Sequence, residues 1–168
     1  MMTNHTTAHD NLTKAVAATA DAPIALTTYA IGSANDLTAI NNFFDQLDSG
    51  TVVTGTVTDI TGSGAQNGGQ YILSTTADTF DPRSTDNITV NLGSLTTTTN
   101  STITELGNLA AEGGVKSIIG TLTLDATRAA LVNSNASITT SNNDLDYVLS
   151  NAIDVDAAAA LAAKTSST

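Results

Sequence analysis

The chain has 168 residues, enough for one domain with a real core, and 40% of them are hydrophobic, which excludes a wholly disordered protein. Sixteen acidic residues against five basic ones give a formal net charge of −11, and such a surface repels nucleic-acid phosphates and anionic membranes. Cysteine is absent and only 4% of residues are aromatic, which excludes thiolate chemistry and disfavours an aromatic-lined pocket.

Residues 1–23 are predicted to form a polar arm with a short helix. Asp10 is suited to cap a helix over residues 11–20, which Pro23 would end. The first residues show neither a basic nor an apolar signal region, so we expect no Sec signal peptide. Residues 24–168 are predicted to form a single strand-helix repeat domain.

Residues 24–31 have the composition of a strand, and an amphipathic helix is predicted after Ser33. Its apolar residues recur three or four positions apart, and Gly50 stands where a left-handed C-cap belongs. The periodic residues are Leu37, Ile40, Phe44 and Leu47. Two β-rich stretches around a glycine-rich loop predict a wide β-hairpin near residues 51–76.

A strand is predicted at residues 88–92, followed by a helix that begins at a capping box. Thr102 and Glu105 have the required spacing, in which the hydroxyl and the carboxylate each satisfy a backbone amide at the helix start. Gly113 and Gly114 would end this helix.

From Gly113 to Lys164 the chain repeats one unit, a short Thr-rich strand, an Asn or Asp cap and a short Ala/Leu helix. The clearest trace is Val-Asn-Ser-Asn-Ala at 132–136 and Val-Leu-Ser-Asn-Ala at 148–152. The predicted strands are 115–124, 136–140 and 152–155, and the predicted caps are Asp125, Asn142 or Asn143, and Asp156. The alternative is a chance pattern in a Thr/Ala/Asn-rich sequence.

Strands joined by helices normally lie parallel with right-handed crossovers, and helices this short need stacked neighbours. We therefore predict an α/β fold of short strand-helix repeats with a largely parallel sheet or β-solenoid-like stack. The predicted core residues of this part are Ile118 or Ile119, Leu122, Leu124, Leu131, Ile138, Leu149, Ile153 and Leu161.

The helix, Gly-Gly connection and Thr-Leu-Thr-Leu strand of residues 102–124 carry a resemblance. Over residues 88–163 the chain resembles the degenerate β/α repeat arrays of bacterial surface and adhesin-like proteins, some of the repeats-in-toxin type. In that family a Gly-Gly-x-Gly-x-Asp nonapeptide binds calcium. The nearest stretch here, residues 62–69, lacks the Asp, so calcium binding by that route is not expected.

Candidate catalytic or metal-binding residues are few. His5 and His9 have the i, i+4 spacing of metal ligands, but they lie in the predicted polar arm, which explains them without a metal. Pairs of acids are suited to calcium or glycoside chemistry, but helix capping and solubility also explain them. These pairs are Asp45/Asp48, Asp144/Asp146 and Asp154/Asp156. We therefore expect no enzyme activity and no catalytic, cofactor-binding or metal-binding residues.

These features favour a non-enzymatic structural protein of an exterior assembly, above all a virion surface component such as a capsid-decorating or fibre protein. The alternatives are an extracellular cell-surface, adhesin or surface-layer module, and a calcium- or polysaccharide-binding module. The expected partners are other protein subunits, either a capsid lattice or copies of this chain, without nucleic acid and without membrane insertion. Residues 156–163 would cap one end of the stack, and residues 51–76 with the arm would contact another subunit.

Overall fold

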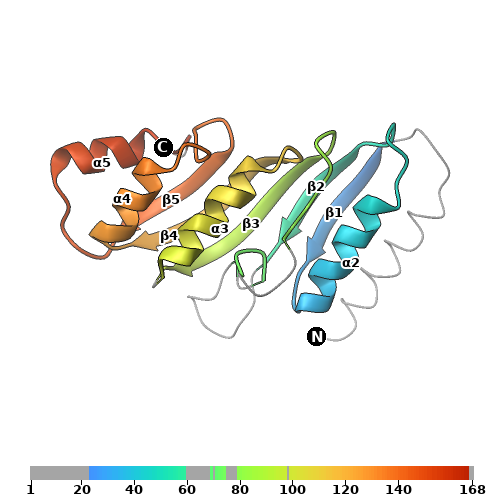
Figure 1. Ribbon diagram of the computed structural model, residues 1–168, viewed down its shortest axis with the longest axis horizontal. Coiled ribbons are helices and arrows are strands. Elements are labelled where there is room, and N and C mark those ends of the chain that lie inside the picture. The colour runs from blue at the N-terminus through green and yellow to red at the C-terminus, as the bar shows by residue number, and fades with distance from the viewer. Residues whose placement is uncertain (1–22, 60–68, 70, 75–78, 98, 167–168) are drawn as a thin grey trace.

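Five strands form one open sheet in which every neighbouring pair is parallel and the order in space is the order in the chain (Figure 1). The computed structural model describes residues 23–59, 69, 71–74, 79–97 and 99–166. The strands are β1 (Ile24–Ala30), β2 (Val53–Thr58), β3 (Asn87–Thr96), β4 (Val115–Leu124) and β5 (Asn143–Leu149). The helices are α2 (Ala34–Asp45), α3 (Asn100–Ala111), α4 (Ala126–Ser134) and α5 (Val155–Ala162). The predicted α/β fold with a parallel sheet is confirmed.

All four described helices cover the same face of the sheet (Figure 1). Each connection leads to the next strand in the same direction, and right-handed crossovers then place every helix on one side. The strands alternate accordingly, because in β2 Val53 and Val57 are fully buried while Thr54, Thr56 and Thr58 are half-buried. The opposite face of the sheet therefore carries mostly hydroxyl, amide and carboxylate side chains.

The predicted helix after Ser33 is confirmed as α2. The Ser33 hydroxyl accepts a hydrogen bond from the Asp36 amide, and the Asp36 carboxylate accepts from the Ser33 hydroxyl at 2.8 Å, so the two side chains cap the helix reciprocally. The C-terminal prediction is wrong, since α2 ends at Asp45 and Gln46, not Gly50, is its C-cap.

The predicted hairpin near residues 51–76 is wrong. β2 pairs in parallel with both β1 and β3, and the described residues 71–73 form turns. The cause is Asp59, whose buried carboxylate accepts hydrogen bonds from the amides of Tyr71 and Ile72, both at 2.7 Å. Ile72, Leu73 and Phe80 are buried and cover the sheet where a helix covers it elsewhere.

The predicted strands at 136–140 and 152–155 are also wrong. β5 occupies residues 143–149, where a helix was expected, because apolar residues alternate there with polar ones and bury Leu145 on the helix side. The matching stretches 132–136 and 148–152 therefore differ in structure, since the first ends α4 and the second ends β5. The repeat is one of strand-helix units, and that sequence match does not mark equivalent positions.

The cap predictions have mixed outcomes. Asp125 caps α4 as predicted, with its carboxylate 2.9 Å from the Arg128 amide. The capping box of Thr102 is wrong, because α3 begins at Asn100 with Thr99 as N-cap and without a side-chain cap bond. The α5 cap is Asp154, which accepts from the Ala157 amide, while Asp156 lies in the first turn.

Most of the predicted core residues are buried. Ile118, Leu122, Leu124, Ile138 and Leu161 are each at most 3% exposed. Leu131 and Ile153 are only half-buried, and Leu149 is 37% exposed, so the core is thinner at the β5 side than we predicted.

Candidate functional site

The buried carboxylates among the described residues are hydrogen-bonded to the backbone. Asp36, Asp59 and Asp86 are at most 7% exposed, and each accepts hydrogen bonds from backbone amides. Hydrogen bonds to the charged form are what makes a buried carboxylate tolerable. These acids hold loops in place through their bonds to backbone amides.

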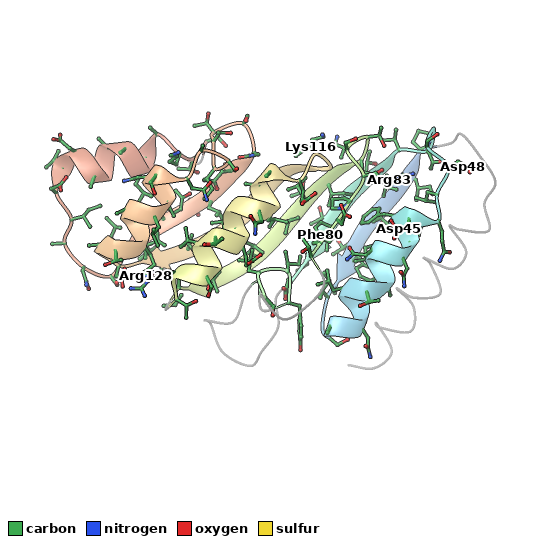
Figure 2. The ribbon with its side chains drawn as sticks, in the orientation of Figure 1. Asp45, Asp48, Phe80, Arg83, Lys116 and Arg128 are labelled. Atoms are coloured by element: carbon green, nitrogen blue, oxygen red, sulfur yellow. The ribbon has the colours of Figure 1, made fainter. Side chains whose placement is uncertain are left out.

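Arg83 and Asp86 form the most connected polar cluster of this kind. Asp86 accepts from the amides of Val53 and Arg83 and forms an ion pair with the guanidinium. Arg83 in turn donates to the carbonyls of Asp48 at 2.9 Å and Thr51 at 2.7 Å. Figure 2 shows Arg83 close to Asp48, at the corner where the chain passes from α2 to β2.

The acid pairs considered from the sequence lie apart from one another. Asp144 and Asp146 are exposed on the open face of β5, opposite Ile119 and Thr121. Asp154 and Asp156 belong to the start of α5, and Asp45 and Asp48 lie at the end of α2 and in the loop after it. Within the described ranges, no group of three or more His, Cys, Asp or Glu residues could hold a metal ion. His5, His9 and residues 62–68 lie outside the described residues.

The side with exposed apolar residues is the last strand-helix unit. Among the described residues, the exposed large hydrophobic side chains are Val148, Leu149 and Val155, at 48%, 37% and 83%. Beside them a groove of about 230 Å³ opens between β5 and α5, lined mainly by Leu145, Tyr147, Leu149, Ala158, Leu161 and Ala162. We call this surface, with Val148 and Val155, the β5–α5 end.

Burial also acts on the tyrosine of this groove. Tyr147 is half-buried, and desolvation raises the pKa of its hydroxyl above the usual value of 10.0, against the opposing effect of the hydrogen bond from Asn143. The phenol is therefore neutral at physiological pH, and the groove also contains Asp146 and Thr165 beside its apolar residues.

α5 covers this end only partly. Leu161 is the buried residue of α5, and the helix packs beside α4. The predicted cap at residues 156–163 therefore leaves apolar side chains in contact with solvent. Sequence reasoning missed Val148 and Val155, although the alternation over residues 143–149 is a strand signal that would have placed Val148 on the open face.

The other edge of the sheet is β1, and its strand is uncharged. Its sequence is Ile-Ala-Leu-Thr-Thr-Tyr-Ala, with Ala25, Thr27, Thr28 and Ala30 exposed. The region around residues 51–76, which we predicted to have an uncovered edge, instead places β2 inside the sheet. Among the described strands, β1 and β5 thus form the two edges of the sheet.

No helix of the described residues combines the length and the apolar character needed to cross a bilayer. Comparisons of the chain with models of protein families, with curated proteins and with solved structures found no match. The functional argument therefore rests on the sequence and on the contacts described above.

Proposed function

We propose that this chain is a non-enzymatic structural protein that contacts other protein subunits through the β5–α5 end. The observation that carries the proposal is the location of the exposed apolar side chains, because Val148, Leu149 and Val155 all belong to the last strand-helix unit. Exposed apolar patches beside a groove are typical of protein contact sites. A repeat array also needs its terminal units covered.

The polar clusters support the same proposal. The buried acids are used to fix loops, and the exposed ones are spread along the open face and the helix starts. A net charge of −11 disfavours nucleic acid as the partner, and the exposed apolar side chains favour a protein surface. Within this function we propose a virion surface component, with a cell-surface, adhesin or surface-layer module as the alternative setting.

The test compares two variants that add the same charge at exposed helical positions. Val155→Asp alters the β5–α5 end without touching the core, since Val155 is 83% exposed, whereas Ala130→Asp alters an exposed site on α4. After expression in the native host, we expect Val155→Asp to lower the fraction of chain recovered in its native assembly at least tenfold. Ala130→Asp should leave that fraction unchanged. Equal recovery of both variants would contradict the proposal.

A further inference from the structure

Along β5, the backbone amide and carbonyl groups face β4 at every second residue and the free edge of the sheet at the residues between. In a parallel strand, successive residues point their amide and carbonyl groups to opposite neighbours. The Asn142 carbonyl accepts from Ile118 of β4, so the carbonyls of Asn143 and Leu145 point away from β4, toward the free edge. This edge is where a further strand would pair.

Residues 164–166 occupy the first part of that edge. The Ser166 amide donates to the Asn143 carbonyl at 2.9 Å, and the Thr165 hydroxyl donates to the Leu145 carbonyl at 2.8 Å. The Asn143 side chain, which is buried, donates to the Lys164 carbonyl at 2.6 Å. Three consecutive residues after α5 are thus bonded to the edge of β5.

A second set of contacts fixes the same segment to the body of the protein. The Lys164 ammonium donates to the Asn135 carbonyl at 2.7 Å, and the Ser166 hydroxyl lies 3.1 Å from the Asp144 carboxylate. These contacts lie along Asn143, Asp144 and Leu145, and the open groove lies beside the second half of β5. Covering an edge with a short segment is a known way to prevent strand addition.

We propose that residues 164–166 are an edge cover, and that their release lets β5 pair in parallel with β1 of a second copy of this chain. The proposal rests on the proposed function, because it concerns how the same end of the array is kept from binding further copies. A copy placed beyond β5 continues the strand order, with its helices on the same face of the sheet.

In this arrangement the side chains of β5 and of β1 from the second copy are compatible position by position. In its pairing with β2, β1 has one extra residue between Leu26 and Tyr29. With that bulge kept, Leu26 and Tyr29 stand beside Leu145 and Tyr147, and Ala30 stands beside Val148. Apolar side chains then meet on the helix face, and on the open face the uncharged side chains of β1 stand beside Asp144, Asp146 and Val148.

Charge favours this partner over a two-fold contact between two β5 strands. A two-fold pairing would bring the exposed Asp144 and Asp146 of one copy close to those of the other, and like charges across neighbouring strands destabilise a sheet. β1 contains no charged residue. The head-to-tail contact joins different surfaces, so it continues from copy to copy and needs a stop.

The first test removes the cover. We expect deletion of residues 164–168 to produce larger species whose amount grows with protein concentration in sedimentation velocity, while the full chain and a control lacking only residues 167 and 168 keep one limiting size. The double variant Thr165→Val with Ser166→Pro removes a hydroxyl and an amide donor and serves if the deletion fails to fold. Unchanged sedimentation of the folded variants would overturn the proposal.

The second test identifies the partner edge by disulfide formation, which is clean because the chain has no cysteine. In the background without residues 164–168, a mixture of Val148→Cys and Ala30→Cys chains should give a disulfide-linked dimer after oxidation. A mixture of Ala130→Cys and Ala30→Cys chains should not. A dimer of Val148→Cys chains alone would indicate a two-fold contact and overturn the head-to-tail arrangement, while still agreeing with the proposed function. Failure of the proposed function itself is detected separately by Val155→Asp in the full chain.

Discussion

The Arg83 guanidinium lies 2.8 Å from the Asp86 carboxylate, and this pair joins the loop after α2 to the start of β2. Asp86 is fully buried and also accepts from the Val53 amide, while Arg83 donates to the Asp48 and Thr51 carbonyls. Residues from two parts of the chain, 48–53 and 83–86, thus meet at one ion pair.

Asp86→Ala should destabilise the protein strongly. The change leaves the Val53 amide and the Arg83 Nε without their acceptor and the guanidinium without its counter-ion, and breaking a buried pair of this kind costs about 3–5 kcal/mol. Urea unfolding followed by circular dichroism measures the loss. Asp48→Ala removes the same charge from an exposed side chain and is expected to change the free energy of unfolding by less than about 0.5 kcal/mol.

Gly55→Ala should be destabilising because of a close approach between strands. Gly55 has a φ of +152°, and a Cβ there would lie 2.0 Å from the Leu26 carbonyl oxygen on β1. Because neither backbone can move aside cheaply, we expect a loss of more than about 1 kcal/mol. Thr54→Ala, on the open face of the same strand, is the control in the same unfolding experiment. Equal losses of stability in Gly55→Ala and Thr54→Ala would show that the close contact between Gly55 and the Leu26 carbonyl has no effect on stability.

The raised pKa of the Tyr29 hydroxyl predicts that the protein loses stability in alkali. Burial, with the nearby Asp36, raises the pKa of its hydroxyl from 10.0 to about 12. The unfolded tyrosine therefore ionises first, so this contribution to stability is intact below pH 10 and is lost as the pH rises toward 12. Tyr29→Phe should flatten the fall in melting temperature over that range, although it also loses the hydrogen bond to the Asp36 carbonyl. An unchanged slope would contradict the assignment.

Folding should be independent of calcium. Asp125 and Asp154 cap α4 and α5, Asp156 lies in the first turn of α5, and Asp144 and Asp146 lie on the open face of β5. A bound ion would therefore gain no cluster of three acidic ligands from the described residues. Thermal melts with excess calcium and with a chelator are expected to coincide. A saturable rise in melting temperature with calcium would instead favour the calcium-binding module considered from the sequence.

Parallel pairing and the helix after Ser33 could be predicted from the sequence because both depend on local signals, namely caps and apolar spacing. The hairpin prediction failed because the buried Asp59 carboxylate turns the chain toward Tyr71, a contact between residues 12 positions apart that no local pattern contains. The strand at β5 was missed because Asn142 and Asn143 look like helix caps. Asn142 instead donates to the Ala110 carbonyl, 32 positions away in the sequence.

The sequence could predict that an exposed contact surface exists, but not where it lies. The sequence indicated that the ends of a strand-helix stack need covering, but it placed the exposed edge near residues 51–76. The described strand of that region, β2, lies inside the sheet, and the exposed large apolar residues of the described chain lie at β5 and α5. Which strand forms an edge is set by the order of strands in space, which depends on long-range pairing.

The most direct test of the central claim, that the β5–α5 end is a contact with other subunits, is hydroxyl-radical footprinting of the chain in its native assembly and as dilute purified protein. We expect oxidation of Val148, Leu149 and Val155 to fall several-fold in the assembly, while oxidation of the half-buried Leu131 on α4 stays the same. Equal oxidation of Val148, Leu149 and Val155 in both states would contradict the claim.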